Sequence, residues 1–372
     1  MNGDWERGEV SPATRRTRLL EVLQDAGSAR VSDLAATFGV TPVTVRRDIA
    51  HLVDQGLARR VHGGATLAEA APGTPSEAER APLRRSNTAR TLGLLVPSLD
   101  HYWPEVVRSA EEAARAHGLR VILRGASFGG FDERPLLQRF VEVGNVNALL
   151  VAPDPTGPHA DEVVEWLLDA PVPVVLVERD LVGVSGSLDS AASHHGFGAA
   201  LAVRHLVELG HRRVGIVLDE QSLARAELHG GWSEACRAAG LPTEGVVDLT
   251  VTRRESGGFD AAVTAAVDEI VRTRTTALLV HRDREAMALV QRCEDRGLSV
   301  PGDLSVVAYD DEVAGLFTPP LTAVRPPRRA VGRAAVGLVA GRLAEPDRPA
   351  HRVVIEPALV VRDSTGAPAA GA

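Results

Sequence analysis

The 372-residue sequence contains no lysine, so all 41 of its basic residues are arginine, which we interpret as a composition bias. Its two cysteines, Cys236 and Cys293, are too few for a disulfide framework or a cysteine-rich metal site. No apolar run approaches the roughly 18–20 residues of a membrane span, and the N-terminal MNGDWERGEV lacks an apolar signal segment. We therefore expect a cytoplasmic protein that does not contact a membrane.

The charge is unevenly distributed. The net charge of −8 argues against a protein that coats nucleic acid along its whole length. Residues 14–64, however, carry eight arginines against five acidic residues, a local charge of +3. This asymmetry suits a small DNA-binding end on an acidic body.

The chain is too long for a single ordinary core, and its composition separates into zones. Residues 1–67 are rich in helix formers and arginine, 68–90 read as a linker rich in Ala, Pro and Ser, and 366–372 form a tail. In 91–365, short apolar runs alternate with amphipathic stretches such as 103–118 and 197–210. The runs are 91–97, 120–125, 148–153, 173–178, 213–219, 277–283 and 304–311. This alternation predicts an α/β fold with parallel sheets covered on both faces.

The N-terminal zone predicts a helix-turn-helix. An amphipathic helix is expected over 14–27, followed by a second that Ser32 caps and Gly39 ends. Thr41 and Pro42 then open a third helix, with Thr as the N-cap and Pro at the first helical position. The N-terminal part of such a recognition helix enters the major groove of DNA.

Two groups of side chains are the expected DNA contacts. The third helix presents Thr41, Thr44, Arg46 and Arg47, and a β-hairpin wing presents Arg59, Arg60 and His62. Four apolar residues of the same helix are expected to pack inward: Val43, Val45, Ile49 and Leu52. In the alternative interpretation, Arg46 and Arg47 are only part of a solvent-exposed helix face, and Thr41 serves only as the helix cap.

Residues 15–66 resemble the winged helix-turn-helix of the deoxyribose-operon-repressor (DeoR-type) regulators. The shared features are V-x-x-L-A, the T-V-R-R-D of the recognition helix and a terminal R-x-H-G-G-A. The resemblance implies binding to double-stranded operator DNA.

Residues 91–365 resemble the effector domain of the lactose/galactose-repressor (LacI/GalR-type) family. The match is carried by VPGDLSVVAYDDEVAGLFTPPLTAVRPPRRAVGRAA (300–335), RVVIEPALVVRDST (352–365) and HLVELGHRRVGIV (205–217). The resemblance implies two lobes joined by three crossovers, with a ligand held between them. One lobe is expected to contain about 91–191 with 324–352, and the other about 192–323 with 353–365.

The resemblance also implies ligand contacts. Asp310 matches a ligand-binding Asp, and a carboxylate there can accept hydrogen bonds from sugar hydroxyls. The other candidates are Glu178, Arg179, Arg225, Arg282, Asp283, Tyr102, Trp103 and His194. Alternatively, Asp310 only caps its loop, and Tyr102 and Trp103 form a hydrophobic staple for the helix that follows them. Since His194 and Arg282 depart from the family pattern, an anionic or unusual ligand is an alternative to a neutral hexose.

Enzymatic function is disfavoured because no G-x-S-x-G, Walker loop or H-E-x-x-H occurs, and the histidines show no tetrahedral metal spacing. We expect no cofactor and no metal. A sugar-processing enzyme, a transporter-linked binding protein and a binding protein without regulatory DNA binding remain the alternatives. The sequence favours a ligand-controlled transcriptional repressor that binds DNA as a homodimer or a dimer of dimers.

Overall fold

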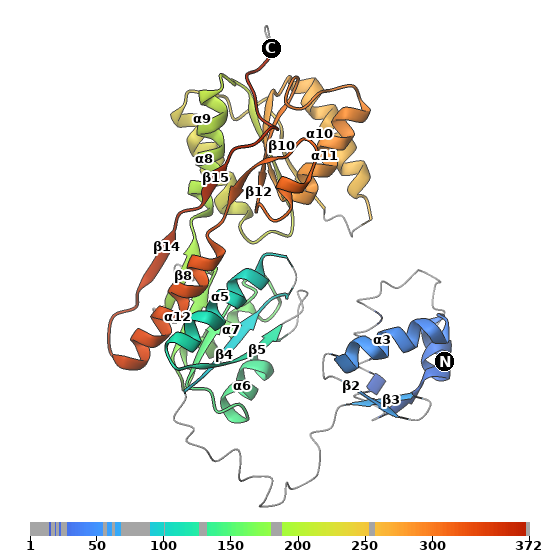
Figure 1. Ribbon diagram of the computed structural model, residues 1–372, viewed down its shortest axis with the longest axis vertical. Coiled ribbons are helices and arrows are strands. Elements are labelled where there is room, and N and C mark those ends of the chain that lie inside the picture. Colours follow the sequence, from blue (N-terminus) through green and yellow to red (C-terminus); the bar gives the residue numbers. More distant parts are fainter. Residues whose placement is uncertain are drawn as a thin grey trace, which may run out of the picture. The chain divides into compact units, whose positions relative to one another are not determined.

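The computed structural model describes residues 15, 19, 22–23, 28–54, 58–61, 64–67, 90–99, 101–125, 132–179, 188–252 and 257–369. The chain divides into two compact units, Met1–Asn87 and Thr88–Ala372, so the border falls inside the segment interpreted as a linker (Figure 1). Most of the helix expected over 14–27 lies outside the described residues.

The described part of the N-terminal unit contains two helices with described bounds, further helical residues at 15, 19, 22 and 23, and a small antiparallel sheet. The elements are β1 (Ser28–Arg30), α2 (Val31–Phe38), α3 (Pro42–Asp54), β2 (Ala58–Val61) and β3 (Gly64–Leu67). The strand order is β1-β3-β2, and β2 and β3 form the expected hairpin. Gly39 ends α2 in the left-handed conformation, at φ 63°. The prediction that Ser32 caps α2 is wrong, because the helix already begins at Val31 and the Ser32 hydroxyl bonds to Asp33 instead.

The core of the N-terminal unit is built from one face of each helix. Val45, Ile49 and Leu52 of α3 are buried at helical spacing, against Leu34 of α2 and Leu19. The prediction that Val43 packs inward is wrong, since its side chain is 67% exposed. Val43 lies about 200° around the helix from Val45, which turns it away from the core.

The C-terminal unit contains two six-stranded sheets covered by helices. The first has the order β14-β8-β7-β6-β4-β5 and is parallel throughout. Its strands are β4 (Thr91–Val96), β5 (Arg120–Gly125), β6 (Ala148–Val151), β7 (Val174–Val177), β8 (Asp189–Ser193) and β14 (Arg352–Ile355). Its helices are α5 (Trp103–Ala116), α6 (Arg134–Glu142), α7 (Ala160–Leu168) and α12 (Arg328–Ala344).

The second sheet repeats this order as β10-β9-β11-β12-β13-β15, with only the β13–β15 pair antiparallel. Its strands are β9 (Val214–Asp219), β10 (Asp248–Val251), β11 (Ala277–His281), β12 (Ser305–Tyr309), β13 (Thr322–Arg325) and β15 (Ala358–Val360). Its helices are α8 (His195–Glu208), α9 (Arg225–Ala238), α10 (Phe259–Thr273), α11 (Asp283–Asp295) and the 3-10 turn η2 (Ala314–Leu316).

The chain crosses between the two sheets at three places: after β8, after β13 and after β14 (Figure 1). We call the first sheet with its helices the first lobe, and the second the second lobe. The observed crossings lie a few residues from the expected borders, because β8 runs to Ser193, β13 to Arg325 and β14 to Ile355. The pattern of apolar residues in the sequence does not locate these crossings, because the strands that precede them are short and are not strongly apolar.

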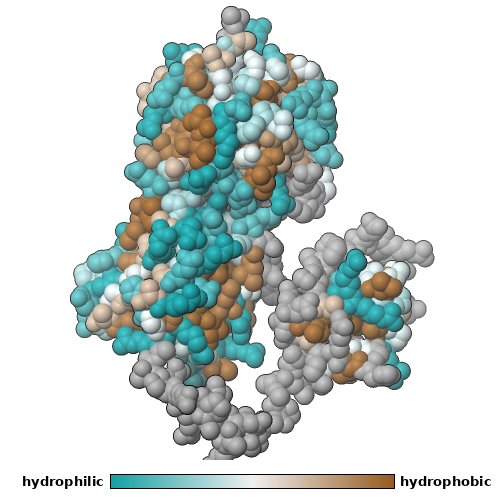
Figure 2. Space-filling view, viewed as in Figure 1, coloured by the Kyte–Doolittle hydropathy of each residue, from teal (hydrophilic) through white to brown (hydrophobic). Residues whose placement is uncertain are grey.

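Each lobe has an apolar core on both faces of its sheet. All seven apolar runs of the sequence form strands, as predicted, while β8 (DSAAS) and β10 (DLTV) carry polar residues and escaped the prediction. Hydrophilic side chains cover most of the face seen in Figure 2. Among the described residues, no helix is both long and apolar enough to span a membrane.

Candidate functional site

Helix α3 presents a basic, exposed face at its N-terminal half. Thr41 caps the helix, since its hydroxyl accepts the Thr44 N–H at 3.3 Å and lies 3.0 Å from the Thr44 hydroxyl. Arg46 and Arg47 are exposed one turn further along. Both proposed roles of Thr41 are therefore compatible, because a capping hydroxyl at the surface retains hydrogen-bonding capacity.

A buried ion pair holds this helix in place. The Nε of Arg15 lies 2.6 Å from Oδ2 of Asp48, and both side chains are less than a tenth exposed. Asp48 lies on the buried face of α3, next to the exposed Arg47. The sequence analysis missed this pair, although an acidic residue at helical spacing from Val45 was a usable signal.

Arg59 and Arg60 belong to the wing strand β2, which pairs with β3. Their side chains and the whole of His62 lie outside the described residues, so their DNA contacts stay predictions.

In the C-terminal unit, charged side chains converge at the carboxyl ends of the second lobe's strands. Asp219 ends β9, Arg282 follows β11 and Asp310 follows β12. Arg282 Nη2 lies 3.6 Å from Asp219 Oδ2, and Arg282 Nε lies 3.8 Å from Asp310 Oδ2. The sheet order reverses between β9 and β11, and ligands of open α/β sheets bind outside the strand ends at such a point.

Asp310 is held tightly by its backbone. Its N–H donates to Val324 O at 3.0 Å, and its carbonyl accepts the Nη1 of Arg328 at 2.8 Å. Its φ is 99°, a conformation that costs a non-glycine residue free energy. Burial raises the pKa of Asp310 to about 7, against the opposing effect of Arg282.

Polar groups of the first lobe gather around Glu178, directly after β7. Its carboxylate accepts the N–H and hydroxyl of Ser193 at 2.9 and 2.8 Å, and the hydroxyl of Tyr102. Glu178 also has a positive φ of 53°. Burial, followed by the charge of Glu178, raises the pKa of Tyr102, so this phenol stays a hydrogen-bond donor.

His195 joins the two polar groups. Its Nδ1 lies 3.0 Å from the hydroxyl of Tyr309 in the second lobe, and its Nε2 lies 3.9 Å from Glu178 Oε2 in the first. The neighbouring His194, which we predicted as a ligand contact, is exposed and caps α8 by accepting the Phe197 N–H at 3.1 Å. The structure therefore brings His195 to the junction of the lobes and gives His194 a local role.

Arg328 forms a second connection between the lobes. Besides Asp310 O, it contacts Glu105 Oε2 at 3.1 Å, and its guanidinium lies 5.3 Å from the ring centroid of Tyr102. The side chain is only 5% exposed. We call the groups around Asp310, Arg282, Glu178 and Tyr102, with His195 and Arg328, the interlobe cluster. His195, Arg328 and Asp219 were missed by the sequence analysis.

Asp283 differs from its predicted role. Its carboxylate accepts four backbone N–H groups, those of residues 311–314, at 2.6 to 3.1 Å, and the residue is 2% exposed. Since this carboxylate is occupied by the loop that follows Asp310, we assign Asp283 a positioning role.

Three other residues that we predicted as ligand contacts do not belong to the interlobe cluster. Trp103 is 7% exposed and packs in the core of the first lobe, which favours the packing alternative for this residue. Arg179 donates to the carbonyls of Pro153 and Glu178 and lies 5.8 Å from the Trp103 ring centroid. Arg225 is exposed at the start of α9.

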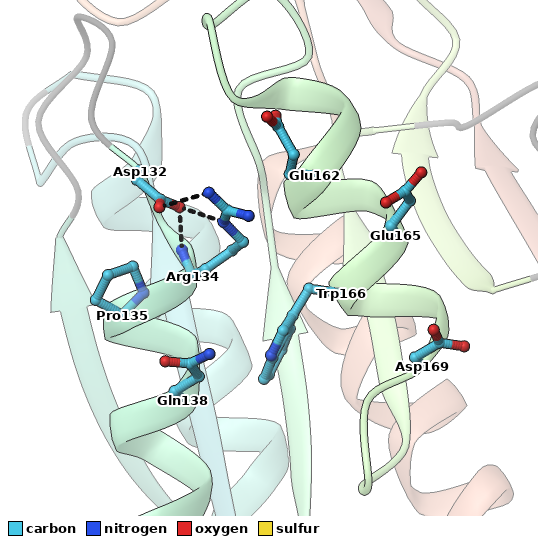
Figure 3. A pocket seen from close by; sticks show the side chains of 8 residues that line it. All are labelled: Asp132, Arg134, Pro135, Gln138, Glu162, Glu165, Trp166 and Asp169. Carbon is cyan, nitrogen blue, oxygen red and sulfur yellow. Dashed lines mark hydrogen bonds and ion pairs between the residues drawn. The ribbon is translucent and has the colours of Figure 1, made fainter.

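A separate groove of about 400 Å³ lies between α6 and α7 (Figure 3). It is lined mainly by acidic side chains with Trp166, and its Arg134 is already paired bidentately with Asp132 at 2.8 and 2.9 Å. The groove contains no residue of the interlobe cluster. Within the described ranges, no group of three or more His, Cys, Asp or Glu side chains is arranged to hold a metal ion.

Comparison with known proteins agrees with this geometry. Residues 15–71 match the DeoR-like helix-turn-helix domain, and residues 203–365 match the periplasmic binding protein-like domain. An uncharacterized HTH-type transcriptional regulator in the aml 5' region of Streptomyces limosus is 32% identical over 77% of this chain and 82% of its own. The HTH-type transcriptional repressor PurR of Photobacterium profundum is 27% identical over 90% and 98%, respectively.

Among solved structures, the transcriptional regulator CelR in complex with cellobiose aligns with a TM-score of 0.62. It is 23% identical and covers 90% of this chain and 99% of its own. The chain belongs to the HTH-type transcriptional regulators, with a DeoR-like helix-turn-helix domain followed by a periplasmic binding protein-like domain. The two sequence relatives named above are both transcriptional regulators by name.

Proposed function

We propose that the protein is a repressor that binds an operator as a homodimer in the cytoplasm and is released by a small effector bound between its lobes. The observation that carries the proposal is the interlobe cluster, at strand ends of a chain that also carries a DNA-binding helix. A sensor with these two parts links the concentration of a small molecule to the occupancy of DNA.

The chemistry of the cluster supports a polyhydroxylated effector, a carbohydrate or a derivative. Asp310 offers a carboxylate acceptor, and Arg282 has a buried Nε without a hydrogen-bond partner. Tyr102 adds a half-buried ring beside Glu178. CelR binds cellobiose on a related fold, which agrees with this class. The charged Arg282 favours an effector that accepts hydrogen bonds near Asp310, such as an acidic or oxidised sugar.

The proposed coupling follows from linkage. Two copies related by a two-fold axis would present two α3 helices to a pseudo-palindromic site. Effector and operator must then change each other's affinity by the same factor, typically corresponding to about 1–3 kcal/mol.

The test is a footprint of the full-length protein on the DNA upstream of its own gene, at fixed salt. Sugars, sugar acids, sugar phosphates and nucleosides are then titrated into the complex. We expect a protected, roughly palindromic site that one compound releases. A folded protein that protects no site under any condition would instead support a binding protein without regulatory DNA binding.

The affinity for the effector is expected to fall as the pH decreases through 7. Because the pKa of Asp310 is about 7, protonation below this pH removes the charge that strengthens hydrogen bonds from the effector's hydroxyls and turns one carboxylate oxygen into a donor. The dissociation constant should rise by up to about tenfold per pH unit below 7. Calorimetry at pH 6, 7 and 8 measures this with the compound that the footprint identifies.

Asp310→Asn is the control for this pH dependence. His281 Nε2 lies 4.0 Å from Asp310 Oδ2, and the variant leaves this imidazole in place. A variant that keeps the wild-type pH dependence would show that Asp310 is not its source.

A further inference from the structure

Val43 is an exposed apolar residue with no place in the core of its domain. The core of the N-terminal unit is formed by ten buried side chains, among them Val45, Ile49 and Leu52 of the same helix. Val43 belongs neither to these nor to the partly buried side chains packed against them. Its side chain is 67% exposed, so it is accessible to another molecule.

The position of Val43 on α3 points to what covers it. Residues three and four apart share a helix face, so Val43 lies on the face of Arg46 and Arg47. It lies in the first turn of α3, directly after Pro42. In a helix-turn-helix, the N-terminal residues of the second helix contact base edges in the major groove.

The branched, wholly apolar side chain of valine can make one kind of contact with a base edge. It neither donates nor accepts a hydrogen bond, so it does not read guanine, cytosine or adenine through their polar groups. The C5-methyl group of thymine is the apolar feature of the major groove. We propose that Val43 contacts a thymine methyl in the operator and selects thymine next to the bases or phosphates that Arg46 and Arg47 contact.

This inference rests on the proposed binding of an operator through α3, and it adds an apolar contact with thymine to the hydrogen bonds that the arginines can donate. A contact through a methyl group also has a fixed signature. The affinity that such a contact contributes is lost when the methyl group of the base is removed, even if the Watson–Crick edge of that base is unchanged.

The test replaces thymine by uracil, which removes only this methyl group. Full-length protein first selects a binding sequence from a pool of random duplexes. Each dT of the selected sequence is then replaced singly by dU, and binding is measured by fluorescence anisotropy at fixed salt. We expect at least one thymine whose replacement weakens wild-type binding about fourfold, the value for burying one methyl-sized group.

Two variants assign this loss to Val43. Val43→Ala should bind the thymine and uracil duplexes about equally, and Val43→Thr, with the same shape but one of its two methyl groups replaced by a hydroxyl, should keep only part of the preference. Val143→Ala is the matched control, since Val143 is 69% exposed and lies in the C-terminal unit. It should keep the wild-type preference.

Each contrary result has a distinct meaning. If the wild type selects a sequence but tolerates uracil at every position, or if Val43→Ala keeps the full preference for thymine, the assignment of Val43 is wrong. If the wild type selects no sequence at all, the proposed operator binding fails and this inference fails with it.

Discussion

Replacing Arg46 and Arg47 together by alanine is expected to reduce operator binding to the non-specific level, a loss of about a thousandfold or more. Both guanidinium groups are exposed on α3, where they can donate charged hydrogen bonds to bases or phosphates. Affinity for the effector should not change, because the interlobe cluster belongs to the other compact unit. Anisotropy with the footprinted operator and calorimetry with its releasing compound measure the two affinities.

A matched control variant distinguishes the loss of a specific DNA contact from the effect of removing two positive charges. Arg115→Ala with Arg272→Ala also removes two arginines that lie on helices and have side chains 70% exposed, but in the C-terminal unit. This variant should retain specific binding within a few fold, since surface ion pairs contribute little to stability. Equal losses in the two double variants would show that α3 does not read the operator.

Asp310→Ala is expected to give a repressor that no longer responds to its effector. The variant loses a buried carboxylate that can accept two hydroxyl hydrogen bonds, and each charged bond contributes about 1.5–3 kcal/mol. The dissociation constant for the effector should rise by at least about a hundredfold. Operator affinity without effector should stay at the wild-type value, so DNA release in the footprint is lost while protection persists.

Folding must be checked for this variant because Asp310 is buried. Thermal unfolding at pH 8 should show a folded variant of near wild-type stability, because losing the ion pair with Arg282 opposes the gain from removing a carboxylate whose ionisation is disfavoured by burial. Asp268→Ala is the control: this residue is 61% exposed, paired with Arg296 and remote from the cluster. A normal response in Asp310→Ala would contradict the proposed effector site.

Seven strands were predictable because each lies in an apolar run, and six of them are buried along their whole length; the exception is the edge strand β5, which carries Arg120 and Arg124. β8 was not predictable, because its Ser and Ala residues carry little apolar signal. Val43 illustrates a different kind of error: in V-T-V either valine can begin an apolar helix face, and only Val45 continues it through Ile49 and Leu52. The spacing of four and seven residues from Val45 to Ile49 and Leu52 was the signal in the sequence that distinguishes the two valines.

The polar site was predictable only where a residue ends an apolar run. Asp310 and Glu178 carry that signal, and Asp219 carries it equally, at the end of β9. The choice between His194 and His195 depends on how the chain turns into α8, which local sequence does not specify. Arg328 reaches Asp310 from the start of α12, and that contact exists only because the chain returns between the lobes there.

The four N–H groups that converge on Asp283 have a consequence for the thermodynamics of effector binding. Ordering a flexible loop costs conformational entropy, on the order of 1–2 kcal/mol for each residue. Residues 311–314 are already held by one carboxylate before any effector arrives, so binding at Asp310 does not carry that cost. The free energy of effector binding is then available for moving the lobes, the step that a sensor has to drive.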